Sequence, residues 1–303
     1  MKSFLLVRTA RTRVLIVLMS VAALFTLALQ YPASSQAAPP SAPKSASGQY
    51  QVYFPTIIGI APAAKAPSKK GVGMPYSNCA DAANAGVMWE YTWGAQPPNC
   101  AGIDNVPMIW GAGNVNATLT GTSQWLMGFN EPDRADQSNI LPAAAAVAWH
   151  QIEQKYPDRK LVAPAPSHLN PNWLVDFRNA YIAQYNKPPR LDALAMHCYM
   201  ATAAECIQLG QTYESWATAW GVKEVWLTEF AFLPCLLGSD DRAVGEGQTM
   251  INWIESQPTI TRMAWFASRI EGTETWAMDC NSPLLDWDTG AQSVYGKMYA
   301  QFH

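Results

Sequence analysis

Eight short apolar runs recur between residues 70 and 268, and this repeat is the feature that most restricts the possible fold. Almost every position in each run is apolar, which is typical of strands in a parallel sheet that is buried on both faces. The runs cover residues 70–76, 87–93, 106–111, 125–130, 160–165, 192–199, 224–230 and 262–268.

Helical patterns fill several of the gaps between these runs. Apolar side chains recur at helical spacing in residues 143–156, 173–185, 213–220 and 245–256. The segments on either side of the third run are short and weakly helical, so they are loops or single turns. Eight strands alternating with helices predict an α/β fold, a (β/α)8 TIM barrel. An open doubly wound sheet is the alternative, but the Gly-rich phosphate turn that usually marks it is missing.

The N-terminal residues 1–37 have the pattern of a secretory signal peptide. Basic residues precede a 16-residue apolar run, Val14 to Leu29, and Ser35-Gln36-Ala37 is a small-residue cleavage pattern. We therefore expect a secreted protein with no stable membrane insertion after cleavage, the alternative being an uncleaved anchor. Residues 38–69 have the Ala/Pro/Ser-rich composition of a linker, which contains a β-prone stretch of unknown role at 50–60. Residues 70–303 remain for the barrel.

Composition narrows the class of ligand. The net charge is −3, and charged residues make up 14% of the chain against roughly 25% in an average soluble domain. No basic cluster indicates nucleic-acid binding. Thirteen Trp and twelve Tyr residues favour a site for flat, weakly charged ligands. We expect a monomer that needs no metal and no organic cofactor.

The six cysteines lack the spacing of a metal site, and export makes disulfides the expected state. Six cysteines allow fifteen pairings. Pairing within local loops predicts Cys79–Cys100, Cys198–Cys206 and Cys235–Cys280.

Two glutamates carry the functional prediction. Glu131, in Gly128-Phe129-Asn130-Glu131-Pro132-Asp133, and Glu229, in Trp226-Leu227-Thr228-Glu229-Phe230, both follow apolar runs. The C-terminal ends of barrel strands hold the active site, and two carboxyls at one rim suit hydrolysis of a glycosidic bond. We assign Glu131 as general acid/base, which requires a raised pKa, and Glu229 as nucleophile. Alternatively, Glu131 only starts a helix and Glu229 only forms a salt bridge.

Further candidates lie at the same strand ends. Asn130 is expected to hold a sugar hydroxyl or orient an acid, unless it is only a turn residue. His197 and Tyr199 share one strand face, from which either could bond Glu229, while Cys198 points away. The remaining candidates contact sugar or belong to the core: Trp93, Trp110, His168 and Trp265. Glu90, three residues before Trp93, faces the opposite way, and Asp133 caps a helix or lines the rim.

At these residues the chain resembles glycoside hydrolase family 128, the group with an Asl1-like catalytic domain, within clan A of the retaining glycosidases. The resemblance spans about residues 70–303. It rests on Lys70-Gly71-Val72-Gly73, Trp89-Glu90-Tyr91-Thr92-Trp93-Gly94, Gly128-Phe129-Asn130-Glu131-Pro132-Asp133, His197-Cys198-Tyr199, Thr228-Glu229-Phe230 and Trp265-Phe266.

The resemblance implies an endo-β-1,3-glucanase that acts on β-glucan with retention. It maps the family's acid/base onto Glu131, its nucleophile onto Glu229, and the clan's strand-eight aromatic onto Trp265. Retention requires carboxyl groups about 5–5.5 Å apart. Glu90 and Thr92 depart from the family pattern, which leaves linkage preference open. The alternatives are another clan A hydrolase (mannanase, xylanase or arabinofuranosidase) and a non-catalytic glucan-binding protein.

Overall fold

The computed structural model describes residues 68–273 and 280–302. The chain divides into two units, Met1–Pro62 and Ala63–His303, and all described residues belong to the second. The predicted signal peptide, nearly all of the linker and the stretch at 50–60 lie outside the described residues. Within the described ranges, no helix combines the length and the apolar character that crossing a membrane requires.

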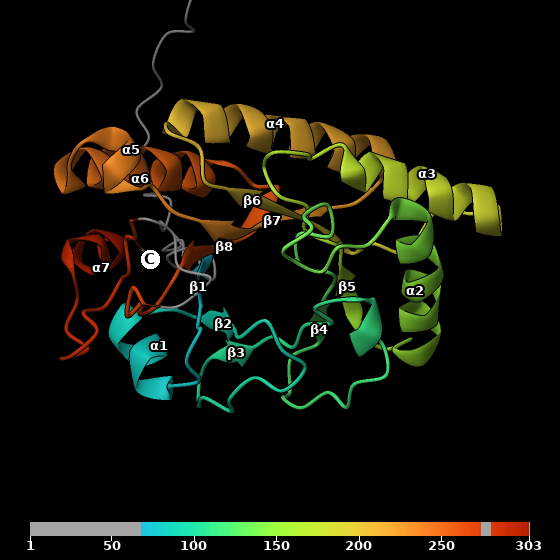
Figure 1. Cartoon of the computed structure of the whole chain (residues 1–303), viewed down its shortest axis with the longest axis horizontal. Helices are drawn as coiled ribbons and strands as arrows, with labels where there is room; N and C mark the ends of the chain where they lie inside the picture. The colour runs from blue at the N-terminus through green and yellow to red at the C-terminus, as the bar shows by residue number, and fades with distance from the viewer. Residues whose placement is uncertain (1–67, 274–279, 303) are drawn as a thin grey trace, which may run out of the picture. The chain divides into compact units, whose positions relative to one another are not determined.

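Eight parallel strands form one curled sheet with helices on its outer side, a barrel-like α/β fold (Figure 1). The strand order is β3-β2-β1-β8-β7-β6-β5-β4. The strands are β1 (Lys70–Gly73), β2 (Trp89–Tyr91), β3 (Asp104–Asn105), β4 (Trp125–Met127), β5 (Lys160–Val162), β6 (Ala193–Cys198), β7 (Glu224–Phe230) and β8 (Ile260–Phe266). Seven of the eight predicted runs overlap a strand, and the remaining strand, β3, lies just before the predicted range 106–111.

The third predicted run, 106–111, comes directly after β3 and is not a regular strand. Its residues make individual backbone hydrogen bonds to two different strands. Val106 donates its N–H to Glu90 of β2, while Ile109 donates to the carbonyl of Met127 in β4. Pro107 has no N–H and cannot donate to a ladder, although its carbonyl accepts from Met127. The proline interrupts the regular pattern, so the run touches both neighbouring strands without forming one continuous strand.

The four predicted helices are present with adjusted ends. They are α2 (Pro142–Lys155), α3 (Trp173–Tyr185), α4 (Ala203–Trp220) and α6 (Asp240–Ser256). Helix α4 starts ten residues before the predicted 213 because Thr202 and Glu205 form a capping box, and Ser239 caps α6. The short elements α1 (Cys79–Ala85), η1 (Ala112–Asn114), α5 (Pro234–Leu237) and α7 (Val294–Tyr299) are too brief for a periodic signal.

Two apolar clusters hold the domain together. The larger one joins the outer face of the sheet to the helices, and the smaller one fills the inside of the curl. At the N-terminal end of the strands, the guanidinium of Arg262 lies 4.3 Å from the ring centre of Trp226 and 5.3 Å from that of Trp89. Arg262 also pairs with Asp104 at 2.7 Å. The charge of Arg262 is thus paired with a carboxylate and covered by aromatic faces. These side chains fill the interior of the sheet at the N-terminal end of the strands, and the polar side chains lie at the C-terminal end.

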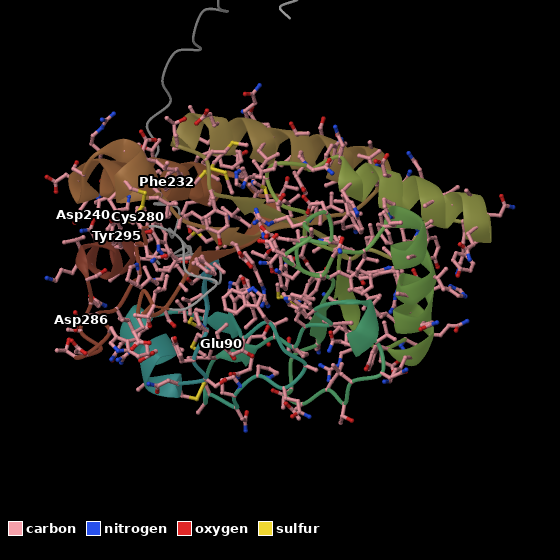
Figure 2. The ribbon with its side chains drawn as sticks, in the orientation of Figure 1. Glu90, Phe232, Asp240, Cys280, Asp286 and Tyr295 are labelled. Atoms are coloured by element: carbon pink, nitrogen blue, oxygen red, sulfur yellow. A yellow bond between two sulfur atoms is a disulfide. The ribbon has the colours of Figure 1, made fainter. Side chains whose placement is uncertain are left out.

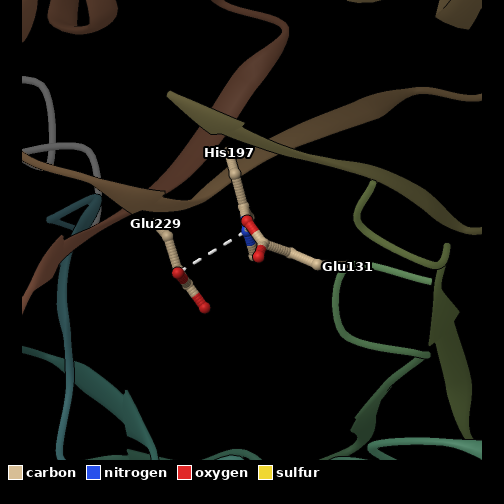
Figure 3. Close-up of side chains that lie close together, drawn as sticks. All are labelled: Glu131, His197 and Glu229. Atoms are coloured by element: carbon tan, nitrogen blue, oxygen red, sulfur yellow. Dashed lines mark hydrogen bonds and ion pairs between the residues drawn. The ribbon is translucent and has the colours of Figure 1, made fainter. Parts of the chain in front are cut away.

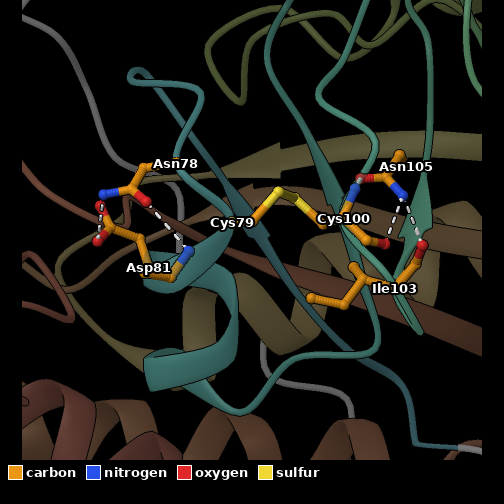
Figure 4. The surroundings of a disulfide bond; sticks show 7 residues. Asn78, Cys79, Asp81, Cys100, Ile103 and Asn105 are labelled. Atoms are coloured by element: carbon orange, nitrogen blue, oxygen red, sulfur yellow. Dashed lines mark hydrogen bonds between the residues drawn. A yellow bond between two sulfur atoms is a disulfide. The ribbon is translucent and has the colours of Figure 1, made fainter.

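The three predicted disulfides are confirmed: Cys79–Cys100, Cys198–Cys206 and Cys235–Cys280. In the first, the side chain of Asn105 braces the loop by accepting from the N–H of Cys100 and donating to the carbonyls of Cys100 and Ile103 (Figure 4). Cys198 belongs to the outer cluster, so its disulfide lies on the side of β6 away from the interior, as predicted.

Glu90 is a buried carboxyl on β2 (Figure 2). Its neighbours Trp89 and Tyr91 belong to the inner cluster, so Glu90 faces the outside of the sheet, as predicted. Neither carboxyl oxygen has a hydrogen-bond partner among the described residues. Burial, with a smaller contribution from the negative charge of Asp104, raises the pKa of Glu90 from 4.5 to about 8. Glu90 is therefore protonated at neutral pH in the folded chain.

Glu90→Gln should relieve a pH-dependent loss of stability. Between about pH 4.5 and 8 the unfolded chain releases this proton while the folded chain keeps it, so wild-type stability falls by up to about 1.4 kcal/mol per pH unit. Glutamine stays neutral in both states. We expect the melting temperature of Glu90→Gln, relative to wild type, to rise from pH 5 to pH 8 in scanning calorimetry. The exposed Glu255→Gln is the matched control, and an equal difference at both pH values would contradict the assignment.

Candidate active site

Glu229 reaches the interior because β7 contains a bulge. Trp226, three residues earlier, lies in the inner cluster, so strict alternation would turn Glu229 outward. The β6–β7 register shifts by one residue between Met196 and His197, after which His197 pairs with Glu229. The extra residue on β7 re-aims the side chain, a common role of bulges beside active sites. Phe230 then returns to the outer cluster.

Glu131 is presented by a similarly irregular end of β4. Gly128 lies against α2, where an added Cβ would come 2.7 Å from the ring of Trp149 and 2.9 Å from the backbone of Pro164. The backbone then turns, with φ of +37° at Glu131, a conformation that costs a non-glycine residue about 1–3 kcal/mol. The N–H of Glu131 donates to the carbonyl of Ala165 and that of Asn130 to Trp110. Bonds to both neighbouring strands hold the strained turn.

Glu131, His197 and Glu229 point toward one another from three different strand ends (Figure 3). Nδ1 of His197 lies 3.1 Å from Oε1 of Glu131 and 3.5 Å from Oε2 of Glu229. One atom from each residue falls within a group whose members all lie within 4.8 Å of one another. Among the described residues no other such group of three acid, His or Cys side chains occurs. The same spacing is compatible with a divalent cation, so the predicted absence of a metal remains a prediction.

The carboxylate of Glu229 has three close donors. Nε1 of Trp93 donates to Oε1 at 2.7 Å, and the hydroxyl of Tyr91 lies 3.2 Å from the same oxygen. The hydroxyl of Tyr199 donates to Oε2 at 2.6 Å. Hydrogen bonds to an ionised group are the strong ones, so both oxygens of Glu229 are fixed in orientation.

The pKa values of the three central groups are linked. Burial raises the pKa of Glu229 and the charge of Glu131 adds to it, against the charge of His197 and the bonds from Tyr199 and Trp93. Burial also acts to raise the pKa of Glu131, but the bond and charge of His197, with Arg134, bring it below its ordinary value. Burial lowers the pKa of His197, yet the two carboxylates outweigh it and the net pKa is raised.

These directions place the shared proton on His197, with Glu131 ionised. The expectation that the surroundings raise the pKa of Glu131 is therefore wrong in this structure. The physical reason is the cationic imidazole between the two carboxyls, which sequence spacing does not show. Nε2 of His197 has no hydrogen-bond partner among the described residues, so all of its polar contacts with them are made through Nδ1.

The loops after β4 and β5 are tied together beside Glu131. Asp133 accepts from the backbone N–H of Ser167 at 2.8 Å and from its hydroxyl at 2.5 Å. Asp133 thus lines the rim and is not a helix cap. The amide nitrogen of Asn130 donates to Gln137 at 3.1 Å. The guanidinium of Arg134 lies 3.4 Å from Oε2 of Glu131, so a cation flanks the candidate acid/base on its exposed side.

The structure brings all but one of the predicted site residues to the inner side of the sheet at this end. Trp93 and Trp110 pack on the inner cluster while staying half-buried. The ring of His168 lies 6.1 Å from that of Tyr199. Whether Trp110, His168 and Asn130 bind sugar stays a prediction.

Trp265 is the exception, and its prediction as a sugar-stacking residue is wrong. It is fully buried in the outer cluster, and its Nε1 donates to the carbonyl of Ser282 at 2.7 Å. Strand alternation is the reason: Ala264 faces the interior, so Trp265 faces the helices. The next residue, Phe266, lies 5.6 Å, centre to centre, from the rings of both Trp93 and Tyr199.

Sequence reasoning missed three residues that reach the site: Tyr91, Arg134 and Phe266. Period-two spacing from Trp93 could have indicated Tyr91. Arg134 lies three residues after Glu131 in the sequence, and its opposite charge was only a weak indication that the two side chains would pair. Phe266 could be predicted as the aromatic residue of the site, in place of Trp265, only once it was known which residues of β8 face the interior.

Comparison with known sequences and structures agrees with this geometry. The sequence model of the family described as "Glycosyl hydrolase catalytic core" matches residues 71–299. Among curated proteins, alkali-sensitive linkage protein 1 of Schizosaccharomyces pombe is 26% identical over 245 residues, which cover 76% of this chain. The match spans only 42% of the length of that relative.

Solved structures of glycoside hydrolase family 128 are similar along nearly their full length. An endo-β-1,3-glucanase of subgroup II from Sorangium cellulosum is 26% identical, with a TM-score of 0.64 over 78% of this chain and 98% of that one. A subgroup I endo-β-1,3-glucanase from Amycolatopsis mediterranei, in complex with laminarihexaose, is 25% identical, with a TM-score of 0.63 over 78% and 100%.

A curdlan-specific exo-β-1,3-glucanase of subgroup III from Blastomyces gilchristii, in complex with glucose, is 25% identical, with a TM-score of 0.60 over 76% of this chain and 97% of that one. With the family match over 71–299 and two glutamates meeting at one imidazole, the resemblance inferred from the sequence is confirmed: the chain belongs to the glycosyl hydrolase catalytic core family and carries an Asl1-like domain of glycoside hydrolase family 128.

Proposed function

We propose that this protein is a secreted endo-β-1,3-glucanase that hydrolyses β-glucan with retention at the anomeric carbon. The observation that carries the proposal is the meeting of Glu131 and Glu229, whose nearest oxygens fall within 4.8 Å. Retaining enzymes place their carboxyl groups about 5–5.5 Å apart, and inverting enzymes about 6.5–9.5 Å. The short separation leaves no room for a water molecule between Glu229 and the anomeric carbon, which supports double displacement.

In the first step Glu229 attacks the anomeric carbon while the glycosidic bond breaks and its oxygen takes a proton from Glu131. In this structure the nearest proton donor to Glu131 is His197, at 3.1 Å from Oε1. Transfer along this bond would load the acid before the reaction. In the second step ionised Glu131 takes a proton from water, and the resulting hydroxide releases the sugar from Glu229.

The choice of β-1,3-glucan rests on the relatives. Laminari-oligosaccharides are bound in several of the family 128 structures, and most of these proteins are described as endo-acting. Mannan and xylan remain alternative substrates because their cleavage uses the same pair of acids. A purely binding function is less well supported, since three donors fix the carboxylate of Glu229 in an orientation that binding alone does not need.

Three further features belong to the proposal. The bonds from 107–110 to β4 support closure of the sheet into a complete (β/α)8 barrel over residues 70–303. The three disulfides and the signal-like N-terminus support export. We also expect the protein to act as a monomer.

Incubation with a panel of polysaccharides tests the substrate. We expect purified protein to release oligosaccharides from laminarin and curdlan, and little from mannan or xylan, when products are separated by chromatography. Oligomers of several lengths indicate endo action, and glucose alone indicates exo action. Matched reactions with a chelator should give the same yield. A loss that a divalent cation restores would make the Glu131–His197–Glu229 group a metal site instead.

Substitution of the two glutamates tests the mechanism. Glu131→Gln should lower kcat for laminarin by roughly 10²–10⁴-fold, the usual contribution of a general acid. On aryl glucosides whose leaving group needs no proton, it should keep the first step, seen as a burst of released phenol, while the second step stays slow because its base is missing. Glu229→Gln should lose activity on both kinds of substrate. Glu224→Gln, at the opposite end of the same strand, is the control. Unchanged release of reducing sugar by either site variant would place catalysis elsewhere.

His197→Asn tests the electrostatics of the pair. In wild type the basic limb of the pH profile of kcat/KM reports the proton held by the His197–Glu131 pair, which rests on an imidazole of raised pKa. Without the imidazole the carboxyl of Glu131 alone must hold that proton. We therefore expect the basic limb to move to lower pH and the maximum to fall by roughly ten-fold, as for one lost bond to a charged group. His150→Asn, on the outer helix α2, should leave the profile unchanged. A basic limb that stays in place or moves to higher pH would contradict this account.

A further inference from the structure

Tyr91 and Trp93 lie on one face of β2 and its C-terminal extension, across the interior from Glu229. The hydroxyl of Tyr91 is 2.8 Å from the carbonyl of Thr228 and 3.2 Å from Oε1 of Glu229. Nε1 of Trp93 donates to the same oxygen at 2.7 Å. Strand β2 therefore supports both the backbone at the bulge and the carboxylate that follows it.

These contacts make the two oxygens of Glu229 unequal. A carboxylate oxygen has about two lone-pair sites. On Oε1 one site accepts from Trp93, and the other faces the hydroxyl of Tyr91, whose single hydrogen is shared between Oε1 and the carbonyl of Thr228. Oε2 receives one short bond, from Tyr199 at 2.6 Å, and lies 3.5 Å from Nδ1 of His197. His197 is in turn bonded to Glu131. Oε2 is thus the oxygen on the side of the acid/base, where a sugar ring bridging the two acids has to lie.

The backbone conformation of Trp93 and the residues packed around its indole ring hold this side chain in place. Trp93 has φ of +56°, and among the described non-glycine residues only Glu131 and two asparagines also have positive φ. Gly73 of β1 makes room for the indole, because a Cβ there would come 2.6 Å from Cη2 of Trp93. The rings of Tyr91 and Phe266 lie 4.8 Å and 5.6 Å from it. Strain in a bulky residue persists only where its surroundings enforce it.

We propose that Tyr91 and Trp93 are positioning residues that occupy Oε1 of Glu229, so that Oε2 is the oxygen that attacks the anomeric carbon. The inference rests on the proposed glucanase function and deepens it. A lone pair of Oε2 forms the bond to carbon, the electrons of the glycosidic bond pass to the leaving oxygen, and the proton of Glu131 goes to that oxygen. The donors on Oε1 keep the carboxylate ionised before the attack and fixed during it.

The test compares Tyr91→Phe and Trp93→Phe with wild type in kinetics on laminari-oligosaccharides across pH. Each variant removes one donor, so kcat should fall by roughly ten- to a hundred-fold, with KM little changed. The acidic limb of kcat/KM should move to higher pH, because a carboxylate with fewer donors holds its proton more tightly. Tyr91→Phe keeps the ring and its packing, which makes it the sharper of the two.

Tyr299→Phe is the matched control. Tyr299 is also fully buried, and its hydroxyl donates to the carbonyl of Gly71 at 2.9 Å, outside the site. Its loss should lower the melting temperature but leave the acidic limb in place. A Tyr91→Phe variant that behaves like Tyr299→Phe would overturn the inference for Tyr91. A Trp93→Phe variant with raised KM and an unmoved acidic limb would make Trp93 a sugar platform only.

The activity of the wild-type protein on glycans shows whether a negative result counts against the proposed glucanase function or only against the positioning role of Tyr91 and Trp93. Wild-type protein that cleaves no glycan overturns the glucanase proposal and, with it, the role of Tyr91 and Trp93. Active wild-type protein with an unmoved acidic limb in both variants overturns only the positioning role. A shifted acidic limb, kcat reduced at constant KM and a folded variant by circular dichroism together support it.

Discussion

The burial of two carboxylates beside one imidazole is the constraint on which the rest of the site depends. Ionised groups are costly to bury unless they are paired and hydrogen-bonded. Here the imidazole of His197 serves both acids, and Arg134 approaches Glu131 from the exposed side. The donors around Glu229 come from β2 and β6, on either side of the interior. Side chains from several strand ends are thus needed to stabilise the two buried carboxylates, Glu131 and Glu229.

The interior of the sheet divides into a closed end and a polar end. Tryptophans from three strands surround Arg262 where the strands begin, and the acids gather where they finish. One strand can therefore contribute a side chain to the apolar interior at its N-terminal end and a side chain to the candidate active site at its C-terminal end. Strand β7 illustrates this: Trp226 fills the interior, and the bulge three residues later brings Glu229 to the same face.

Much of the fold followed from local patterns. Apolar runs placed seven of the eight strands, helical spacing placed the four long helices, and short loops paired the cysteines correctly. The misses have physical causes. Pro107 breaks the ladder where a third strand was expected, and short elements such as α1 and α7 depend on caps and contacts from distant residues. The burial of Glu90 was not predictable, because its outward direction alone does not tell whether a helix or loop covers it.

The sequence by itself determined the order of strands and helices, the residue types at the strand ends and which two glutamates stand there, because these depend on residue type and short-range spacing. Tertiary structure alone decided which side chains face the acids. A one-residue bulge turned Glu229 inward, strand parity placed Phe266 rather than Trp265 beside the site, and the curl of the sheet brought Tyr91 and Trp93 onto Glu229. Such outcomes depend on how distant strands align, and a shift of one residue reverses the face of every side chain that follows.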